Sequence, residues 1–350
     1  MRKSLYVGVI VLVILSFVVS ACAPAATPTA APTSAAAPTS APAPTQPAKA
    51  WKMAALFPGV ITDADYNTLG YQGLTEVKDK LGVETAYSES VPVPDIDRAM
   101  REYIDQGFNI IWTHGSQFLN QTIELAKQMP DVVFIAEGDS EVKDPPSNFW
   151  LVDRNFHVGY YAIGAIAAKA TKTGKIGYIG GATLPFSYAE VHAVQQAIKD
   201  LNANVEFKTV WTGDFNDPTK GRQFADAMIS EGVDVIICSL NLGIFGVFEA
   251  AKAKGDGILV TAKYIDKTSF APKNYITSLL YDFKGPMTEI VKRIKAGEKG
   301  AYYPLGFATG VDVQFPLQNV APDLQTQIQS IVNDVKSGKI QVVKNTDKVQ

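Results

Sequence analysis

The sequence predicts an α/β protein with two doubly wound, Rossmann-like lobes joined by a hinge. From Trp51 onward, short and almost uninterrupted apolar runs alternate with helical patterns. Apolar strands separated by helices are typical of parallel sheets with right-handed crossovers. The alternation occurs twice, before and after about residue 155, and the roughly 300 residues after position 48 are enough for two domains.

The chain begins with the features of a secretory leader. Arg2 and Lys3 precede an uncharged run at residues 5–19, and small residues lead from there to Cys22. The run has 15 residues, fewer than the roughly 20 that a spanning helix needs. Its end resembles the bacterial lipobox, which implies that residues 1–22 are a lipoprotein signal peptide and that Cys22 carries palmitate and other acyl chains. The alternatives are an ordinary signal peptide with a chance cysteine, or an uncleaved anchor.

The segment that follows predicts a spacer. Residues 23–48 contain only Ala, Pro, Thr, Ser and one Gln. Such a composition buries too little apolar surface to offset chain entropy, so we expect residues 23–49 to be a disordered linker. Leader and linker together predict a globular body held by lipid on the extracytoplasmic face of the cell membrane.

Charge and cysteine content exclude several function classes. Of the 32 basic residues, Arg2 and Lys3 leave with the leader, so the mature chain has 35 acidic residues against 30 basic ones. No basic stripe is present, and nucleic acid is therefore excluded as a partner. The second cysteine, Cys238, lies in an apolar run and is expected to pack in the core. The three histidines lack metal-ligand spacing, so neither metal nor cofactor is expected.

Strands and helices can be placed from the apolar periods. The strand-like runs are 53–57, 83–87, 109–113, 132–136, 175–179, 205–211, 233–238, 258–262 and 275–280. The helical stretches are 67–81, 95–106, 117–128, 157–171, 189–202, 218–231, 244–254, 287–296 and 323–337. We therefore expect an N-terminal lobe at 50–155, a C-terminal lobe at 156–282, and segments at 283–350 that cross back between the lobes.

Aromatic and polar side chains cluster in the segments that follow the strands. Open α/β sheets bind ligands beyond the carboxyl ends of their strands. Rings that stack and polar groups that read an edge suit a flat, heteroatom-rich ligand. Trp211 can instead belong to the core, and Asp63, Asp65 and Asp217 can be helix caps. The candidate ligand-binding residues are Tyr66, Asn67, Ser116, Glu137, Phe186, Trp211, Phe215, Asn241, Tyr264, Asp266 and Tyr281.

At these loops the chain resembles the Bmp/Med family of substrate-binding lipoproteins. The resemblance runs from about Trp51 to Pro316. It implies the type I periplasmic binding protein fold and, as partners, a small ligand and an ABC permease with its ATPase. The segments that carry it are Ile-Thr-Asp-Ala-Asp-Tyr-Asn at 61–67, Thr-Lys-Thr-Gly-Lys-Ile-Gly-Tyr-Ile-Gly at 171–180, Val-Trp-Thr at 210–212, Asn-Asp-Pro at 216–218, and Asp266 with Phe270 and Pro272.

The resemblance also implies residue roles. Members bind purine nucleosides, and a related group is suited to purine bases or other flat heterocycles. Tyr66 matches the ring that stacks on the base, Asn67 the amide beside it, Glu137 a carboxylate that reads the base edge, and Phe215 a second aromatic ring.

The departures from the family pattern concern the sugar. Phe57 stands where nucleoside-binding members have an aspartate, and Tyr264 and Tyr281 stand where an aspartate and a lysine hold ribose. Losing those charge-assisted hydrogen bonds, each worth roughly 1.5–3 kcal/mol, favours a nucleobase-like ligand over a nucleoside.

The alternatives to an importer's binding protein are an enzyme and a ligand sensor. An enzyme is disfavoured because the sequence has no dinucleotide or phosphate loop, no Gly-x-Ser-x-Gly elbow and no His-Glu-x-x-His. A sensor that presents its closed form to a membrane receptor would have the same sequence features as an importer's binding protein. We expect a monomeric binding protein whose lobes close on the ligand.

Overall fold

The computed structural model describes residues 50–349. The expected signal peptide, the lipidation site Cys22 and the expected linker at 23–49 lie outside the described residues. Within the described part of the chain, no helix combines the length and apolar character needed to cross a membrane.

The first sheet has six strands, all parallel, in the order β11-β5-β4-β3-β1-β2. Every residue of β3, β4 and β5 is buried, as expected where helices cover both faces of a sheet. The strands are β1 (Lys52–Leu56), β2 (Glu84–Ser88), β3 (Ile110–Thr113), β4 (Val133–Gly138), β5 (Phe149–Arg154) and β11 (Ala301–Leu305).

The second sheet also has six strands, in the order β12-β10-β9-β8-β6-β7. Only the edge strand β12 runs antiparallel, against β10. The strands are β6 (Lys175–Gly180), β7 (Glu206–Trp211), β8 (Val235–Ser239), β9 (Leu259–Tyr264), β10 (Tyr275–Tyr281) and β12 (Val311–Val313). Ignoring the added edge strand, both sheets share one doubly wound order, and the predicted α/β fold class is confirmed.

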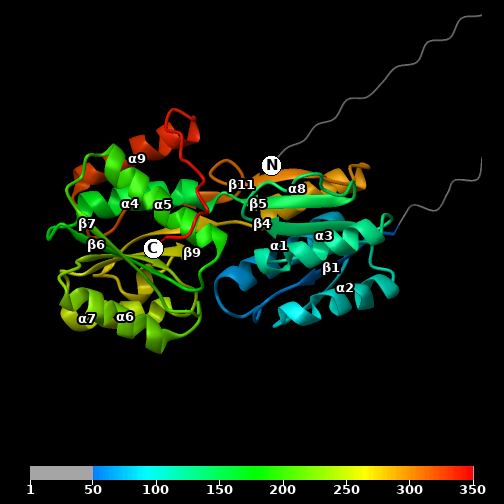
Figure 1. Ribbon diagram of the computed structural model, residues 1–350, viewed down its shortest axis with the longest axis horizontal. Coiled ribbons are helices and arrows are strands. Elements are labelled where there is room, and N and C mark those ends of the chain that lie inside the picture. The colour runs from blue at the N-terminus through cyan, green and yellow to red at the C-terminus, as the bar shows by residue number, and fades with distance from the viewer. Residues whose placement is uncertain (1–49, 350) are drawn as a thin grey trace, which may run out of the picture. The chain divides into compact units, whose positions relative to one another are not determined.

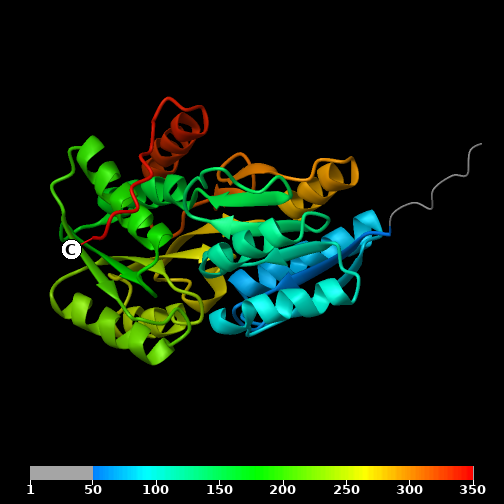
Figure 2. The same ribbon diagram turned by 45° about the vertical axis from the view of Figure 1, so that its right-hand side comes forward.

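The helices that cover the sheets pack on one another in pairs and one group of three. Helix α1 packs on α8, α4 on α5 and α9, and α6 on α7. Figures 1 and 2 both show α9, in red, beside the green helices α4 and α5. The helices are α1 (Tyr66–Leu81), α2 (Ile96–Asp105), α3 (Leu119–Gln128), α4 (Phe156–Ala170), α5 (Pro185–Asp200), α6 (Pro218–Ser230), α7 (Ile244–Lys254), α8 (Lys284–Lys295) and α9 (Pro322–Lys336), with 3₁₀ turns η1 (Val93–Asp95), η2 (Ser116–Phe118) and η3 (Thr268–Phe270).

The chain passes between the two sheets three times. It leaves the first sheet after β5, returns after β10 to form α8 and β11, and crosses again from β11 to β12. The C-terminal tail then reaches the end of β5, where Lys344 forms an ion pair with Asp153. Short connections between two lobes are the usual form of a hinge.

The structure differs from the sequence prediction at a few elements. The apolar pattern missed β5 because its run continues almost directly into the apolar helix α4. It missed β11 and β12 because β11 contains Pro304, tolerated here at the sheet edge, and β12 has three residues. Helix α5 begins at Pro185 and not at 189, since proline suits the first turn of a helix.

Candidate ligand-binding site

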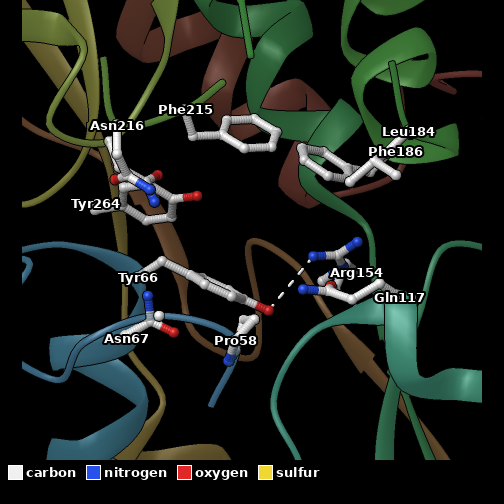
Figure 3. Close-up of a pocket in the computed structure, with 12 residues that line it drawn as sticks. Pro58, Tyr66, Asn67, Gln117, Arg154, Leu184, Phe186, Phe215, Asn216 and Tyr264 are labelled. Carbon is white, nitrogen blue, oxygen red and sulfur yellow. Dashed lines mark hydrogen bonds between the residues drawn. The ribbon is translucent and has the colours of Figure 1, made fainter. Parts of the chain in front are cut away.

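A pocket of about 190 Å³ lies where the carboxyl ends of the strands in both lobes meet (Figure 3). Each lobe contributes half of its lining. The first lobe supplies Pro58, Gly59, Tyr66, Asn67, Gln117 and Arg154, and the second supplies Leu184, Phe186, Phe215, Asn216, Asn241 and Tyr264.

On the first-lobe side, Tyr66 is fixed by a buried polar cluster. Its hydroxyl donates to Glu137 Oε2, and its ring stacks on His114 with centroids 3.9 Å apart. His114 Nδ1 lies 2.5 Å from Glu137 Oε1, and its Nε2 lies 2.9 Å from the Tyr66 carbonyl oxygen. Burial alone would raise the pKa of Glu137, but His114, Arg154 and the hydrogen bond from Tyr66 hold it below its ordinary value. The Tyr66 ring is therefore a fixed wall of the pocket.

Arg154 ends β5 and is also held by buried partners. Its Nε and Nη2 donate to Asp139 Oδ1 at 2.9 and 2.5 Å, and Nη2 donates to Ser116 Oγ at 2.5 Å. Its guanidinium carbon lies 4.4 Å from the centre of the Phe186 ring, so the contact joins the two lobes. Burial alone would lower the pKa of Arg154, but Asp139, Tyr66 and Glu137 raise it, and the guanidinium stays protonated.

Asn67 presents a fixed acceptor. Its Nδ2 donates to Asp63 Oδ2 at 2.7 Å, which settles the orientation of the amide, because a carboxylate only accepts. Asn67 Oδ1 is buried and lacks a partner among the described residues. Gly59 must be glycine here, since a Cβ would come 2.6 Å from Asn67 Nδ2. Asn241 Oδ1, on the other lobe, is likewise buried without a described partner.

On the second-lobe side, two phenylalanines form the wall. Phe186 in the first turn of α5 and Phe215 in the loop after β7 lie nearly parallel, with an interplanar angle of 20° and centroids 6.1 Å apart. A Cβ at Gly181 would collide with the Phe215 ring, so glycine is required for this placement. Figure 3 shows both rings on the side of the pocket opposite Tyr66.

A buried lysine lies close to these rings. Lys263 Nζ is 5.5 Å from the Phe186 ring centre, 5.6 Å from Phe215 and 4.7 Å from Tyr264. It donates to Ser239 Oγ at 2.8 Å, and that hydroxyl donates in turn to Glu190 Oε2 at 2.7 Å. Burial lowers the pKa of Lys263 against the attraction of Glu190, and burial raises the pKa of Glu190.

One buried ion pair connects the lobes directly. Asp65, just before α1, contacts Lys267, which follows β9, and each side chain is 1 % exposed. Burial raises the pKa of Asp65 to about 7, although Lys267 opposes the rise. The Asp65 side chain faces Lys267 and does not cap its helix through a hydrogen bond. Asp63 and Asp217 do act as caps, accepting from the backbone amides of Thr68 and Lys220 respectively.

The structure brings six of the predicted residues together in the pocket: Tyr66, Asn67, Phe186, Phe215, Asn241 and Tyr264. Two others stand behind the first-lobe lining, where Glu137 fixes Tyr66 and Ser116 fixes Arg154. Neither residue lines the pocket. Glu137 therefore cannot contact the edge of a base in the pocket directly, as the resemblance had implied.

Three further predicted residues lie elsewhere. Trp211, the last residue of β7, packs edge-on against the Tyr178 ring of β6 and the Tyr188 ring of α5. Asp266 accepts from the backbone and hydroxyl of Thr268 and borders a different hollow. Tyr281 is buried beneath Tyr264 and Phe156, with ring centroids at 5.0 and 4.4 Å.

Six lining residues are not among those predicted from the sequence: Pro58, Gly59, Gln117, Arg154, Leu184 and Asn216. For Arg154 a signal existed, since a charge at the end of an apolar run is the same pattern that singled out Glu137. Among residues 50–349, no group of three or more His, Cys, Asp or Glu side chains is placed to hold a metal ion.

Comparison with known proteins identifies the family. A family model described as "ABC transporter substrate-binding protein PnrA-like" matches residues 50–346. Basic membrane protein B of Borreliella burgdorferi is 28% identical over 299 residues, covering 81% of this chain and 85% of that protein. A purine-binding protein of Brucella abortus is 26% identical over 296 residues, covering 83% and 82%.

Solved structures agree on the fold. An ABC transporter solute-binding protein of Aeropyrum pernix superposes with a TM-score of 0.74 at 19% identity, covering 85% of this chain and 94% of that one. One from Conexibacter woesei gives 0.69 at 21% identity, covering 85% and 100%. The family model describes substrate-binding proteins and not enzymes. The chain belongs to the Bmp family of ABC transporter substrate-binding proteins.

Proposed function

We propose that the protein is a lipid-anchored receptor that captures a flat heteroaromatic ligand, a purine base, and delivers it to an ABC permease with its ATPase. The observation that carries the proposal is the pocket with rings on opposite lobes: Tyr66 on one side, Phe186 and Phe215 on the other. Aromatic rings on both faces suit a planar ligand, because stacking of a base on an aromatic ring is worth about 1–3 kcal/mol.

The polar groups support a ligand with nitrogen and oxygen at its edge. Asn67 Oδ1 and Asn241 Oδ1 are buried acceptors without described partners, one on each lobe. Buried polar groups in native proteins are nearly always hydrogen-bonded, so ring N–H groups of a ligand would complete both amides. A hydrocarbon ring would leave them unpaired.

The size of the pocket supports a base over a nucleoside. Its volume of about 190 Å³ is below the roughly 300–1,000 Å³ of pockets for drug-sized ligands. Tyr264 lines it at a position where nucleoside-binding relatives are expected to hold ribose with a charged group. This ligand class is consistent with the Brucella abortus relative, which is a purine-binding protein.

The mechanism is closure of the two lobes. A ligand that touches residues of both lobes stabilises the closed form by its differential affinity for that form. The three short crossings between the sheets allow such a rotation while each sheet stays intact. The closed form would then be recognised by the membrane complex, with the protein acting as a monomer.

Equilibrium titration tests the ligand class. We expect purine bases to bind the purified protein more tightly than the matching nucleosides, and Phe215→Ala to weaken binding by about 1–3 kcal/mol. The matched control is Phe270→Ala, which removes an exposed ring outside the pocket. Nucleosides binding much more tightly than bases would refute the base preference. If neither class binds the folded protein, the proposed function is wrong.

Anchoring is tested separately. We expect the full-length protein to partition into the detergent phase and to incorporate a labelled fatty acid, because three acyl chains hold a protein far more firmly than one. The Cys22→Ala variant should lose both properties while it keeps ligand affinity. Retention of the label by that variant would place the modification at another residue.

A further inference from the structure

The end of the pocket at the Tyr66 hydroxyl is dominated by one donor, Arg154. Figure 3 shows Arg154 and Gln117 at this end and Asn67 at the opposite end of the Tyr66 side chain. Arg154 Nε and Nη2 are engaged by Asp139 and Ser116. Among the described residues, Nη1 donates a hydrogen bond only to the Tyr66 hydroxyl oxygen, at 3.4 Å, and it lies 4.0 Å from Glu137 Oε2, which leaves one of its N–H groups free for the pocket.

The side-chain acceptors nearby are mostly used. The Tyr66 hydroxyl gives its hydrogen to Glu137 and accepts from Arg154 Nη1, and the other oxygen of Glu137 lies 2.5 Å from His114. Neither Glu137 nor Asp139 lines the pocket. Apart from the adjustable amide of Gln117, a ligand therefore meets a donor, and a positively charged one, at this end.

The donor is also held in place. Asp139 and Ser116 accept hydrogen bonds from one side of the guanidinium, and the Phe186 ring centre lies 4.4 Å from the guanidinium carbon. Arg154 is 4 % exposed. A planar group locked in this way keeps its remaining N–H in a constant direction, so it can discriminate between ligands by hydrogen bonding.

We propose that Arg154 is a specificity-determining residue that selects a ligand with a ring carbonyl at this end, an oxo-substituted purine, over one with an amino group. The inference rests on the proposed function and narrows its substrate class. A carbonyl oxygen accepts a charge-assisted hydrogen bond from Nη1. An amino group there places donor against donor, and both remain unpaired in a buried site.

Titration with matched bases tests the proposal. The full-length protein is titrated with hypoxanthine, adenine and unsubstituted purine, which differ in the substituent at ring position 6 and, for hypoxanthine, in the hydrogen that N1 carries. We expect hypoxanthine to bind at least about tenfold more tightly than adenine, with purine in between. Equal or tighter binding of adenine overturns the role of Arg154 and leaves the proposed function intact. If none of the three binds the folded protein, the proposed function fails first.

A double variant assigns the preference to this residue. Arg154→Gln with Asp139→Asn removes the guanidinium together with the carboxylate that it contacts most closely, while Glu137 keeps Tyr66 and His114 as partners, and the new amide can donate or accept. We expect the ratio of hypoxanthine to adenine affinity to fall toward one. The control Arg293→Gln with Glu298→Gln removes an ion pair outside the pocket and should keep the ratio. A ratio unchanged in the first double variant refutes the assignment, and if that variant does not fold, the ratio of the unmodified protein decides.

Discussion

The two lobes face the same pocket but bury their charges in different ways. In the first lobe, the partners of the buried carboxylates touch them directly: Arg154 Nη2 lies 2.5 Å from Asp139 Oδ1, and His114 Nδ1 lies 2.5 Å from Glu137 Oε1. In the second lobe, the hydroxyl of Ser239 stands between Lys263 and Glu190. Direct pairing holds the pKa of Glu137 below its ordinary value, although burial alone would raise it, whereas burial raises the pKa of Glu190.

The two lobes therefore have different tasks at the pocket. The first lobe keeps a fixed set of donors and acceptors around Tyr66, which suits recognition of a ligand edge. The second lobe surrounds its lysine with the rings of Phe186, Phe215 and Tyr264. A cation near a ring face is attracted by the ring quadrupole, so Lys263 stabilises the aromatic wall more than it offers a hydrogen bond to the pocket.

The largest expected effect comes from removing the second-lobe cation. Lys263→Met leaves Glu190 buried without a compensating charge, which should lower the free energy of unfolding by about 3–5 kcal/mol near pH 8. Glu190 already has a raised pKa, and it is higher still without Lys263. A carboxyl with a raised folded-state pKa contributes stability at low pH that is lost as the pH rises through that pKa. Denaturant unfolding should therefore show a smaller loss at pH 5.

Two further variants sharpen this result. Adding Glu190→Gln to Lys263→Met should restore most of the stability, because no buried charge remains. Lys208→Met provides the control, since it removes an exposed ion pair to Glu231 and should change stability by within about 0.5 kcal/mol. If Lys263→Met is as stable as that control, the second lobe does not depend on its buried charge.

The next prediction contrasts the two aromatic walls. Tyr66→Ala and Phe215→Ala should each weaken binding of the proposed ligand by about 1–3 kcal/mol. Only Tyr66→Ala should also destabilise the fold strongly, because Tyr66 is buried and bonded to Glu137, whereas Phe215 is half-buried. Calorimetric titration and thermal unfolding measure the two effects. If both substitutions leave affinity unchanged, the ligand does not lie between these rings.

A smaller change tests the fixed character of the first wall. Tyr66→Phe keeps the ring but leaves Glu137 Oε2 without its hydroxyl donor, so we expect the free energy of unfolding to fall by about 1–3 kcal/mol. Tyr264→Phe on the second lobe removes no hydrogen bond to a buried carboxylate and should be nearly neutral. Equal stability of the two variants would contradict the distinction between the walls.

Most strands could be predicted from the sequence because a buried strand is marked by its own run of apolar residues. Apolar runs such as those of β1, β8 and β9 can be read without knowing what packs on them. The aromatic side chains after the strands also led to Tyr66, Phe186 and Phe215, since doubly wound sheets gather these loops at one edge.

The polar partners could not be predicted in the same way. Arg154 and Ser116 are separated by 38 positions in the chain, and Asp65 and Lys267 by 202. Which side chains meet is decided by the tertiary packing, within the first lobe for Arg154 and Ser116 and between the lobes for Asp65 and Lys267, and no local pattern contains that information. The same reason explains Glu137, whose position at a strand end is visible in the sequence while its use as a support for Tyr66 is not.

The smallest expected effect concerns the ion pair that connects the two walls, and it depends on pH. Asp65 faces Lys267, Lys263 and Asp63, and its pKa in this conformation is about 7 against 3.8 for an ordinary aspartate. Opening the lobes would return it toward the ordinary value, so the closed form takes up a proton and is favoured at low pH. This contribution is complete below about pH 4 and is lost as the pH rises through 7. Affinity should therefore weaken by about 1 kcal/mol between pH 6 and 8, and Asp65→Asn should flatten the dependence. The exposed Asp256→Asn should leave it unchanged. An affinity that strengthens with rising pH would show that the ion pair with Lys267, and not the protonated carboxyl, holds the lobes together.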